Sequence, residues 1–318
     1  IFMIMMIFTD FVDFDDYDSP QGMTVRNSTF ENNLANGSSS EEGGGAIYFD
    51  ASEVDDNESP YNELSIYDSI FKGNKAPNGS GRGGAIFVNQ DDSSDDASDL
   101  AFIGVYNSVF YDNTANDGGA IFYYFTESDP NYDLVNSIFY NNTARNSGGA
   151  VAISDTDSTP QLDILSCTFV NNTAGGDGGA LAVLDASGLT LNIFNSIFWG
   201  NTATGNGSQI YSDDSDASIN LEYSLVQDLG STGISGDTFN QDSNISSDPV
   251  FVNIGSPWGA DGIPATADDG LRLNTGSPAL NTGNNVSGSA DKADEDILGN
   301  SRSNYDMGAF ESIAPPPA

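Results

Sequence analysis

The chain has 318 residues, of which 47 are Asp or Glu, 8 are Lys or Arg and none is His, for a formal net charge of −39. This charge disfavours nucleic acid and anionic membrane surfaces as partners, and it favours cations, neutral surfaces and a saline exterior in which salt screens self-repulsion. With no His and a single Cys, Cys167, the sequence excludes Cys/His zinc sites, His-based catalytic triads and an intramolecular disulfide.

The first eight residues, IFMIMMIF, are apolar but too few to cross a bilayer, which needs about 20 residues. We expect them to form a buried first strand or a strand donated to a neighbouring molecule, and we expect no direct membrane span in this chain. Together with the acidic stretch that follows, they form an N-terminal segment, residues 1–20. The chain starts without Met and ends in APPPA, so we expect it to be part of a longer or processed protein.

A motif then recurs along residues 21–230. Each copy has a Phe, an Asn three positions later and an Ala two positions beyond that, and the interval between copies settles at 27 to 30 residues after two longer ones. A fixed period of this size predicts a solenoid. A weaker seventh copy is centred on Leu225, with Asp228 in place of Asn. The predicted ladder residues are Phe30, Phe71, Phe110, Phe139, Phe169 and Phe198, with Asn33, Asn74, Asn113, Asn142, Asn172 and Asn201.

The units read as strands and bends. Apolar pairs such as Leu162/Ile164 alternate with polar residues before each motif, which indicates strands rather than helices. We expect the motif Asn to occupy a left-handed corner and to hydrogen-bond between coils, with a second Asx-rich column three residues before each Phe. The Gly pairs at 44–45, 83–84, 118–119, 148–149 and 178–179 predict a further corner with positive φ.

Three short strands per turn, each paired with its counterpart one coil away, predict an all-β fold. Specifically, we expect a right-handed, single-stranded parallel β-helix of about six to seven coils with the phenylalanines stacked inside. Cys167 takes a position that is Ser in most copies, and we interpret it as a small structural residue.

Two stretches resemble known families. The tetrapeptides GGAI, GGAV and GGAL, interleaved with F-x-x-N, resemble the repeats of the polymorphic outer-membrane protein family. That resemblance implies a β-helical passenger displayed on a bacterial surface, often adhesive. Within residues 248–311, DPVFVN, DDGLRLNTGSPALNTGNN and DILGNSRSNYDMGAFE are similar to the C-terminal end of choice-of-anchor β-helix proteins. We therefore expect residues 231–311 to cap the last coil, with residues 312–318 as a Pro-rich linker.

The segments between each Gly-Gly-Ala strand and the next repeat are acid-rich, and stacking should bring them to one edge of the rod. They form either a solvated acidic face or a calcium site built from adjacent loops. No cofactor is required, and calcium is the candidate ligand. The candidate metal ligands are Asp91, Asp92, Asp95, Asp96, Asp213, Asp214 and Asp216.

The residue after each Phe is expected to face outward. From Tyr111 through Tyr140 to Trp199 it forms a partly aromatic stripe. This stripe is either a surface for a sugar or a protein partner, or the ordinary preference of strands for aromatic residues.

Two functions remain open. The first is an extracellular bacterial protein, secreted or attached to the cell surface, with a structural or adhesive role and with ends that stack head to tail into a filament. Its partners would be further copies or a host or surface glycan or protein. The second is polysaccharide binding or degradation by lyase or hydrolase chemistry. The few basic residues do not recur with an acid cluster on a strand, so we favour a non-enzymatic protein with no catalytic residues.

Overall fold

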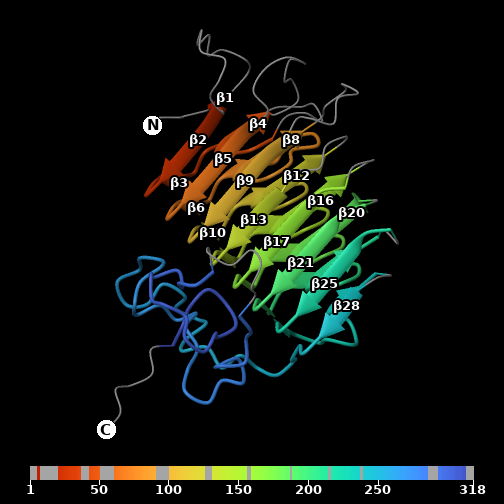
Figure 1. Cartoon of the computed structure of the whole chain (residues 1–318). Coiled ribbons are helices and arrows are strands. Elements are labelled where there is room, and N and C mark those ends of the chain that lie inside the picture. Colours follow the sequence, from red (N-terminus) through yellow and green to blue (C-terminus); the bar gives the residue numbers. More distant parts are fainter. Residues whose placement is uncertain are drawn as a thin grey trace.

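A computed structural model of the chain (Figure 1) describes residues 6–7, 21–36, 43–50, 61–90, 100–125, 131–155, 159–186, 188–213, 216–236, 239–285 and 293–312. These residues form strands, turns and loops, and the strands lie in four sheets that follow one common axis. Every strand pairing within the sheets is parallel, as between β10 and β14 or β13 and β17. The predicted parallel β-helix is confirmed.

Two of the sheets contain eight strands each. Sheet A consists of β1 (Met6–Ile7), β4 (Ile47–Asp50), β8 (Ile86–Gln90), β12 (Ile121–Phe125), β16 (Val151–Asp155), β20 (Leu181–Ala186), β24 (Ile210–Ser212) and β27 (Ile234–Ser235). Sheet B consists of β2 (Gln21–Arg26), β5 (Tyr61–Tyr67), β9 (Leu100–Tyr106), β13 (Asn131–Val135), β17 (Gln161–Leu165), β21 (Thr190–Phe194), β25 (Ser218–Glu222) and β28 (Phe239–Asp242).

The other two sheets are built from shorter strands. Sheet C consists of β3 (Thr29–Glu31), β6 (Ile70–Lys72), β10 (Val109–Tyr111), β14 (Ile138–Tyr140), β18 (Thr168–Val170), β22 (Ile197–Trp199) and β26 (Leu225–Val226). Sheet D consists of β7 (Lys75–Ala76), β11 (Thr114–Ala115), β15 (Thr143–Ala144), β19 (Thr173–Ala174) and β23 (Thr202–Ala203).

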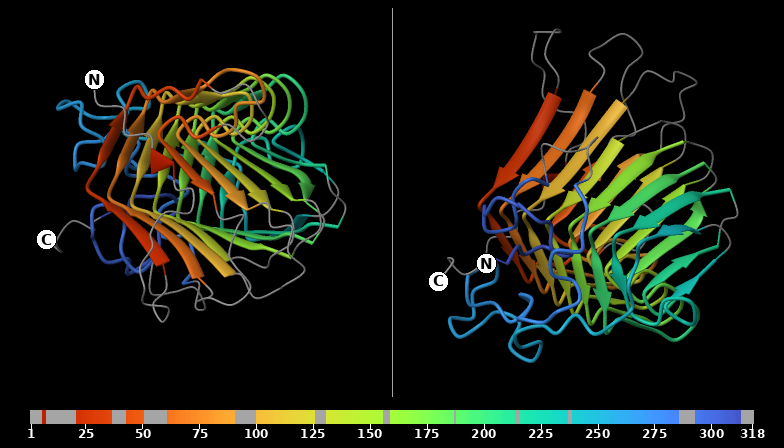
Figure 2. Two further views of the ribbon diagram at one scale, coloured as in Figure 1. Left: turned by 90° about the horizontal axis from the view of Figure 1, so that it is seen from above. Right: turned by 60° about the horizontal axis from the view of Figure 1, so that its bottom comes forward.

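Each of the five coils that contribute a strand to sheet D therefore has four strands rather than the three expected. The chain passes through sheets B, C, D and A in turn, as in β13, β14, β15 and β16, and Figure 2 shows the successive coils stacked on one another. The fourth strand is the two-residue segment that follows the motif Asn. Such a segment is too short to show an alternation of apolar and polar residues, which is why the sequence did not reveal it.

The core lies inside the coils. In β17, Leu162 and Ile164 point inward and are fully buried, and Leu162 lies in register between Tyr132 of β13 and Leu191 of β21. Successive strand residues alternate between the two faces of a sheet, so the polar neighbour Asp163 faces outward. Each buried Leu or Ile contributes about 1.5 to 3 kcal/mol, and the in-register stacking repeats this contribution in every coil.

Glycines occupy the corner before sheet A, as predicted. The first Gly of each pair has positive φ, for example +67° at Gly148. The second Gly is needed for a different reason, because a Cβ on Gly149 would clash with the carbonyl oxygen of Gly179 in the next coil. The pair thus combines a left-handed corner with the closest approach between neighbouring coils.

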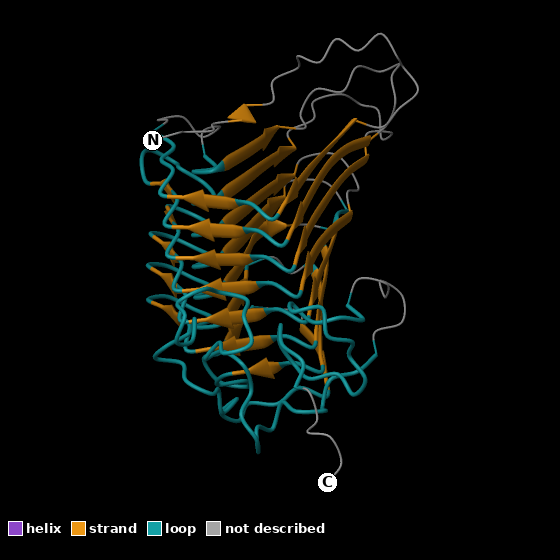
Figure 3. Ribbon diagram, turned by 90° about the vertical axis from the view of Figure 1, so that its left-hand side faces the viewer, coloured by secondary structure: helices purple, strands orange, loops and turns teal. Residues whose placement is uncertain are grey.

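Residues 247–285 and 293–312, called the C-terminal segment from here on, leave the coils and lie beside the solenoid (blue in Figure 1; the same side of the molecule faces the viewer in Figure 3). We expected this region to cap the last coil. Its residues Ala279 and Met307 pack with Leu225 of β26 in one of the last coils. Its apolar side chains Leu271, Ile297 and Phe310 pack against the outward residues Val109, Ile138 and Val170 of sheet C. These three come from β10, β14 and β18, so the segment covers the middle coils as well.

Within the described residues, no helix is long and apolar enough to cross a lipid bilayer.

Candidate functional site

The phenylalanines of the repeat form one interior column. The ring centroids of Phe30 and Phe71 are 4.8 Å apart with 4° between their planes, and the spacing stays between 4.6 and 4.9 Å along the rest of the column. The stack arises because sheet C pairs in register, which places each ring over the next. Its members are Phe30, Phe71, Phe110, Phe139, Phe169 and Phe198.

A hydrogen-bonded asparagine ladder runs beside the rings. In the fully buried Asn142, Nδ2 donates to Oδ1 of Asn172 and to the carbonyl oxygen of Phe110, both at 3.0 Å. Its Oδ1 accepts from the backbone N–H and the Nδ2 of Asn113 at 3.1 and 2.9 Å. Both ends of the carboxamide are thereby satisfied inside the core, as buried polar groups require. Side-chain bonds of 2.8 to 3.0 Å connect Asn33, Asn74, Asn113, Asn142, Asn172 and Asn201.

The ladder has a direction and a defined end. Each Nδ2 donates toward the C-terminal neighbour, and the last member, Asn201, donates to Oε1 of Gln209 at 2.7 Å. The Nε2 of Gln209 donates back to the carbonyl oxygen of Asn201 at 3.2 Å. Gln209 takes the interior position that Ala180 has one coil earlier. Gln209 was not predicted from the sequence, although the change from GGAL at 178–181 to GSQI at 207–210 was a signal for it.

The left-handed corner lies one residue before the position we expected. Asn141 has φ of +55° and Asn171 has φ of +57°, whereas the ladder residues after them are not among the residues with positive φ. The expectation for Asn142 was wrong in this respect, because its amide must point inward to bond the adjacent coils. The second Asx-rich column does adopt left-handed φ, at Asn27, Asp68, Asn107, Asn136, Ser166 and Asn195.

Serines form a further ladder at the start of sheet C. The backbone N–H of Ser108 donates to Oγ of Ser137 at 3.2 Å, and the backbone N–H of Cys167 donates to Oγ of Ser196 at 3.1 Å. Cys167 is fully buried, and burial raises the pKa of its thiol to about 12. A thiol in this state is unreactive at neutral pH, which fits a packing role.

This repeat geometry coincides with a known sequence family. The chain matches the Chlamydia polymorphic membrane protein repeat at residues 27–50, 68–89, 107–123 and 166–183. The chain carries polymorphic membrane protein repeats. Each matched stretch begins at a left-handed residue before sheet C, such as Asn27 or Ser166, and runs through the Gly pair into sheet A. The predicted resemblance is confirmed over residues 27–183, and it points to a membrane or surface protein. No curated protein matches the chain.

The C-terminal segment packs against the aromatic stripe on the outward face of sheet C. Tyr111, Tyr140 and Trp199 all pack with the apolar cluster that joins sheet C to this segment. The Trp258 ring lies 5.0 Å from the ring of Tyr111 and 5.5 Å from that of Tyr140. Of the two interpretations of the stripe, a fully open surface for a sugar or a protein partner does not apply at Tyr111, which is buried and contacts Trp258 of the same chain.

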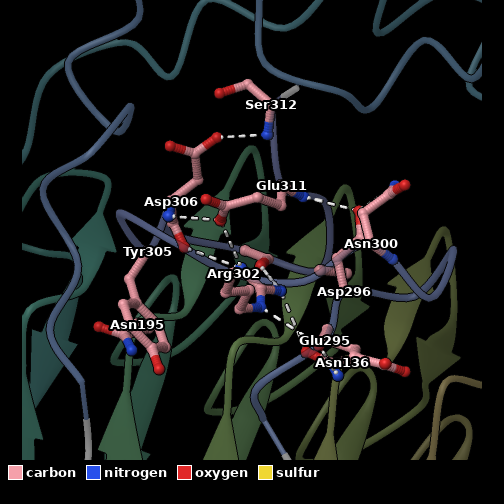
Figure 4. Close-up of polar contacts among 12 residues, drawn as sticks. Asn136, Asn195, Glu295, Asp296, Asn300, Arg302, Tyr305, Asp306, Glu311 and Ser312 are labelled. Atoms are coloured by element: carbon pink, nitrogen blue, oxygen red, sulfur yellow. Dashed lines mark hydrogen bonds and ion pairs between the residues drawn. The ribbon is translucent and has the colours of Figure 1, made fainter. Parts of the chain in front are cut away.

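A buried arginine fixes the C-terminal segment to a corner of the repeats (Figure 4). Arg302 Nη2 donates to Oδ1 of Asn136 at 3.0 Å and to the carbonyl oxygen of Gly308 at 2.9 Å. Its Nη1 lies 3.4 Å from Oε2 of Glu311. Burial raises the pKa of the Glu311 carboxyl, which the adjacent guanidinium opposes. Asn195, from the same corner column as Asn136, exchanges two hydrogen bonds with the backbone of residue 284.

The acid-rich edge falls largely outside the described residues, as do Asp91, Asp92, Asp95, Asp96 and Asp214. Asp213 and Asp216 flank the junction between β24 and β25, and Oδ1 of Asp213 accepts from the backbone N–H of Asp185 at 2.9 Å. In the described part of the chain, no three acidic or thiol groups are placed to hold a metal ion. Calcium binding at this edge stays a prediction.

The outward face of sheet B carries a polar ladder that was not predicted from the sequence. Asn192 Nδ2 donates to Oδ1 of Asp163, and Asn220 Nδ2 donates to Oδ1 of Asn192, both at 2.8 Å. Asn240 continues the row at 3.0 Å. One coil before Asp163, Asp133 accepts a 2.7 Å hydrogen bond from the hydroxyl of Tyr106. From Asp133 through Asp163 and Asn192 to Asn220 these residues recur at intervals of 28 to 30 residues, which was the signal available in the sequence.

Proposed function

We propose that the chain is an extracellular, non-enzymatic structural and adhesive protein, secreted or attached to the cell surface. The proposal is supported by the polymorphic membrane protein repeats, whose family comprises membrane and surface proteins. It is also supported by how the repeat residues are used. The side chains of the Phe and Asn columns stack and hydrogen-bond between neighbouring coils. We therefore assign these columns a structural role rather than a role in binding a substrate.

A scaffold of this kind keeps its outward positions free to vary, because the interior columns alone specify the stacking. Outward positions on sheet B, such as Asn220 and Asn240, are partly or fully exposed. These outward positions of sheet B form a surface through which adhesion would occur.

Surface exposure and adhesion are tested separately. Intact cells that produce the protein should be labelled by an antibody against the purified chain, and a brief protease treatment of the intact cells should remove the label. Beads coated with the folded chain should bind target cells or immobilised glycans more than beads coated with the heat-unfolded chain. Labelling that requires permeabilised cells would refute the surface location. Equal binding by folded and unfolded chains would refute the adhesive role.

A second candidate is polysaccharide binding or cleavage on sheet B. It is favoured by Asp133 and Asp163, which are register partners on the outward face and nearly buried. Paired carboxylates on one face are the groups that glycoside hydrolysis uses. Incubation with plant, algal and bacterial glycans should then release reducing ends with the unchanged chain and not with Asp133→Asn. Absence of product with the unchanged chain would remove the hydrolase alternative.

A further inference from the structure

In the described part of the chain, β2 and β28 are the two edge strands of sheet B and lie at opposite ends of the solenoid (Figure 1). Its first strand, β2, pairs only with β5, and its last strand, β28, pairs only with β25, among the strands of the described residues. An edge strand presents unpaired backbone N–H and C=O groups, which another parallel strand can satisfy. Because all strands of the sheet run the same way, a copy shifted along the axis would bring its β2 beside β28 in parallel orientation.

The interior side chains at these two edges belong to the same register column. Met23 pairs in register with Leu64 at one end, and Phe239 pairs with Ile219 at the other. Both Met23 and Phe239 are only partly buried against the core, in contrast to the buried residues between them. Contact between Met23 and Phe239 would therefore continue the apolar column across a junction between two copies.

The outward side chains at the two edges carry opposite charges. In the neighbouring column, Arg26 is the first residue and Asp242 is the last, and both are exposed. Asp242 is the register partner of Glu222, so this column ends in two adjacent carboxylates. Like charges at directly opposed positions destabilise a sheet, and a cation beside them removes that penalty. Arg26 of a second copy would supply this cation, while it keeps its place 3.7 Å from the ring centroid of Tyr67.

We propose that copies of this chain stack head to tail, with β28 of one copy pairing parallel to β2 of the next. Across the junction, Asp242 faces Arg26 and Phe239 covers Met23. The inference rests on the proposed structural role at the cell surface and names a second copy of the chain as the partner. The contact joins the β28 edge of one copy to the β2 edge of another. A dimer therefore still has one free β2 edge and one free β28 edge, so further copies can add at both ends to form a linear filament.

Salt should promote this assembly. Each copy carries a formal net charge of −39, so two copies repel each other at low ionic strength. At physiological ionic strength, salt screens charges that are more than about 8 Å apart. It therefore suppresses the long-range repulsion between copies, but it weakens the attraction between Arg26 and Asp242 at the junction less. In sedimentation-velocity experiments the full chain should be monomeric in 10 mM salt and should form larger species with rising protein concentration in roughly 150 to 500 mM salt.

Engineered cross-links test the register directly. Thr24 and Asn240 are the first and last residues of the outward column next to Arg26 and Asp242. Adjacent strands are about 4.8 Å apart, which lies within the Cα separation that a disulfide spans. The full chain with Thr24→Cys and Asn240→Cys should therefore give a ladder of dimers, trimers and longer species on a non-reducing gel after mild oxidation. Cys167 is fully buried and should not contribute.

Two control variants test the register and the head-to-tail direction of the proposed stacking. The pair Gly22→Cys and Asn240→Cys uses the same face but lies two residues out of register, and we expect less than about a tenth of the cross-linking, because the strand rise of about 3.3 Å per residue separates the thiols. Equal cross-linking by both pairs would overturn the proposed register. Efficient dimerisation of the single variant Thr24→Cys would overturn the head-to-tail direction.

Charge reversal tests the same contact without new covalent bonds. Arg26→Asp and Asp242→Arg should each raise the dissociation constant for contact between two copies by about fivefold or more. The variant that carries both changes should recover most of the lost affinity. Unchanged circular dichroism melting temperatures would show that the variants fold. A full chain that stays monomeric at every salt and protein concentration, with cross-linking no greater than the out-of-register control, would overturn assembly. That outcome would leave the antibody-labelling result, and so the proposed surface role, unaffected.

Discussion

Removal of one central ladder residue should destabilise the solenoid strongly. In Asn142→Ala, four hydrogen bonds of the side chain disappear, all between 2.9 and 3.1 Å. The backbone N–H and Nδ2 of Asn113 and the carbonyl oxygen of Phe110 then lose these partners inside a buried core. Nδ2 of Asn113 keeps its other bond, to the carbonyl oxygen of Phe71 at 3.0 Å. A buried hydrogen bond contributes about 0.5 to 1.5 kcal/mol, so the four lost bonds should lower the free energy of unfolding by roughly 2 to 6 kcal/mol.

The end of the ladder provides a matched control. Asn33 is only partly buried, and its side chain donates one bond of 2.8 Å, to Oδ1 of Asn74. We expect Asn33→Ala to cost about 1 kcal/mol, because water can replace the lost partner. Urea unfolding followed by circular dichroism measures both variants, and hydrogen exchange at the Asn113 amide should accelerate only in Asn142→Ala. Similar losses of stability in the two variants would refute the argument that burial of the ladder determines its cost.

Three further changes have defined outcomes. Tyr123→Phe should raise the free energy of unfolding by about 1 kcal/mol in thermal melts, since the buried Tyr123 hydroxyl has no hydrogen-bond partner among the described residues; a loss of stability would point to an unseen partner. Gly148→Ala should cost about 2 kcal/mol or more, because φ is +67° and the new Cβ would clash with the carbonyl oxygen of Val151; a neutral result in the same melts would contradict the corner argument. Burial raises the pKa of Asp269 to about 6, above an unfolded value of about 3.9, so its ionisation opposes folding as pH rises from about 4 to 7. Asp269→Asn should therefore gain stability relative to the unchanged chain by up to about 3 kcal/mol over this range, and a difference independent of pH would refute this assignment.

The columns of this fold were predictable because their members recur. Phe139 and Asn142 could be placed in interior ladders from the interval between copies alone. The left-handed corner was misplaced because several copies contain two successive asparagines, as at Asn141 and Asn142. Gly73, which stands at the first of these two positions in another copy and has φ of +62°, held the correct signal.

Contacts that do not repeat were not predictable in the same way. The pairing of Tyr111 with Trp258 joins residues far apart in the sequence, and no periodicity relates them. In the sequence, nothing distinguishes Arg302 from the other seven basic residues. Only the fold shows that its guanidinium donates a hydrogen bond to Asn136. An outward aromatic side chain looks the same in a sequence whether solvent or another segment covers it.

The one-way asparagine ladder also limits how such a protein changes its length. A coil inserted in the middle of the column would receive a donor from the coil before it and offer one to the coil after it, so both junctions would match the existing ones. A partial coil would leave an amide unmatched in the interior. Duplicating one repeat should therefore lengthen the rod by about 4.8 Å at little cost, whereas a fragment of a repeat should not be tolerated.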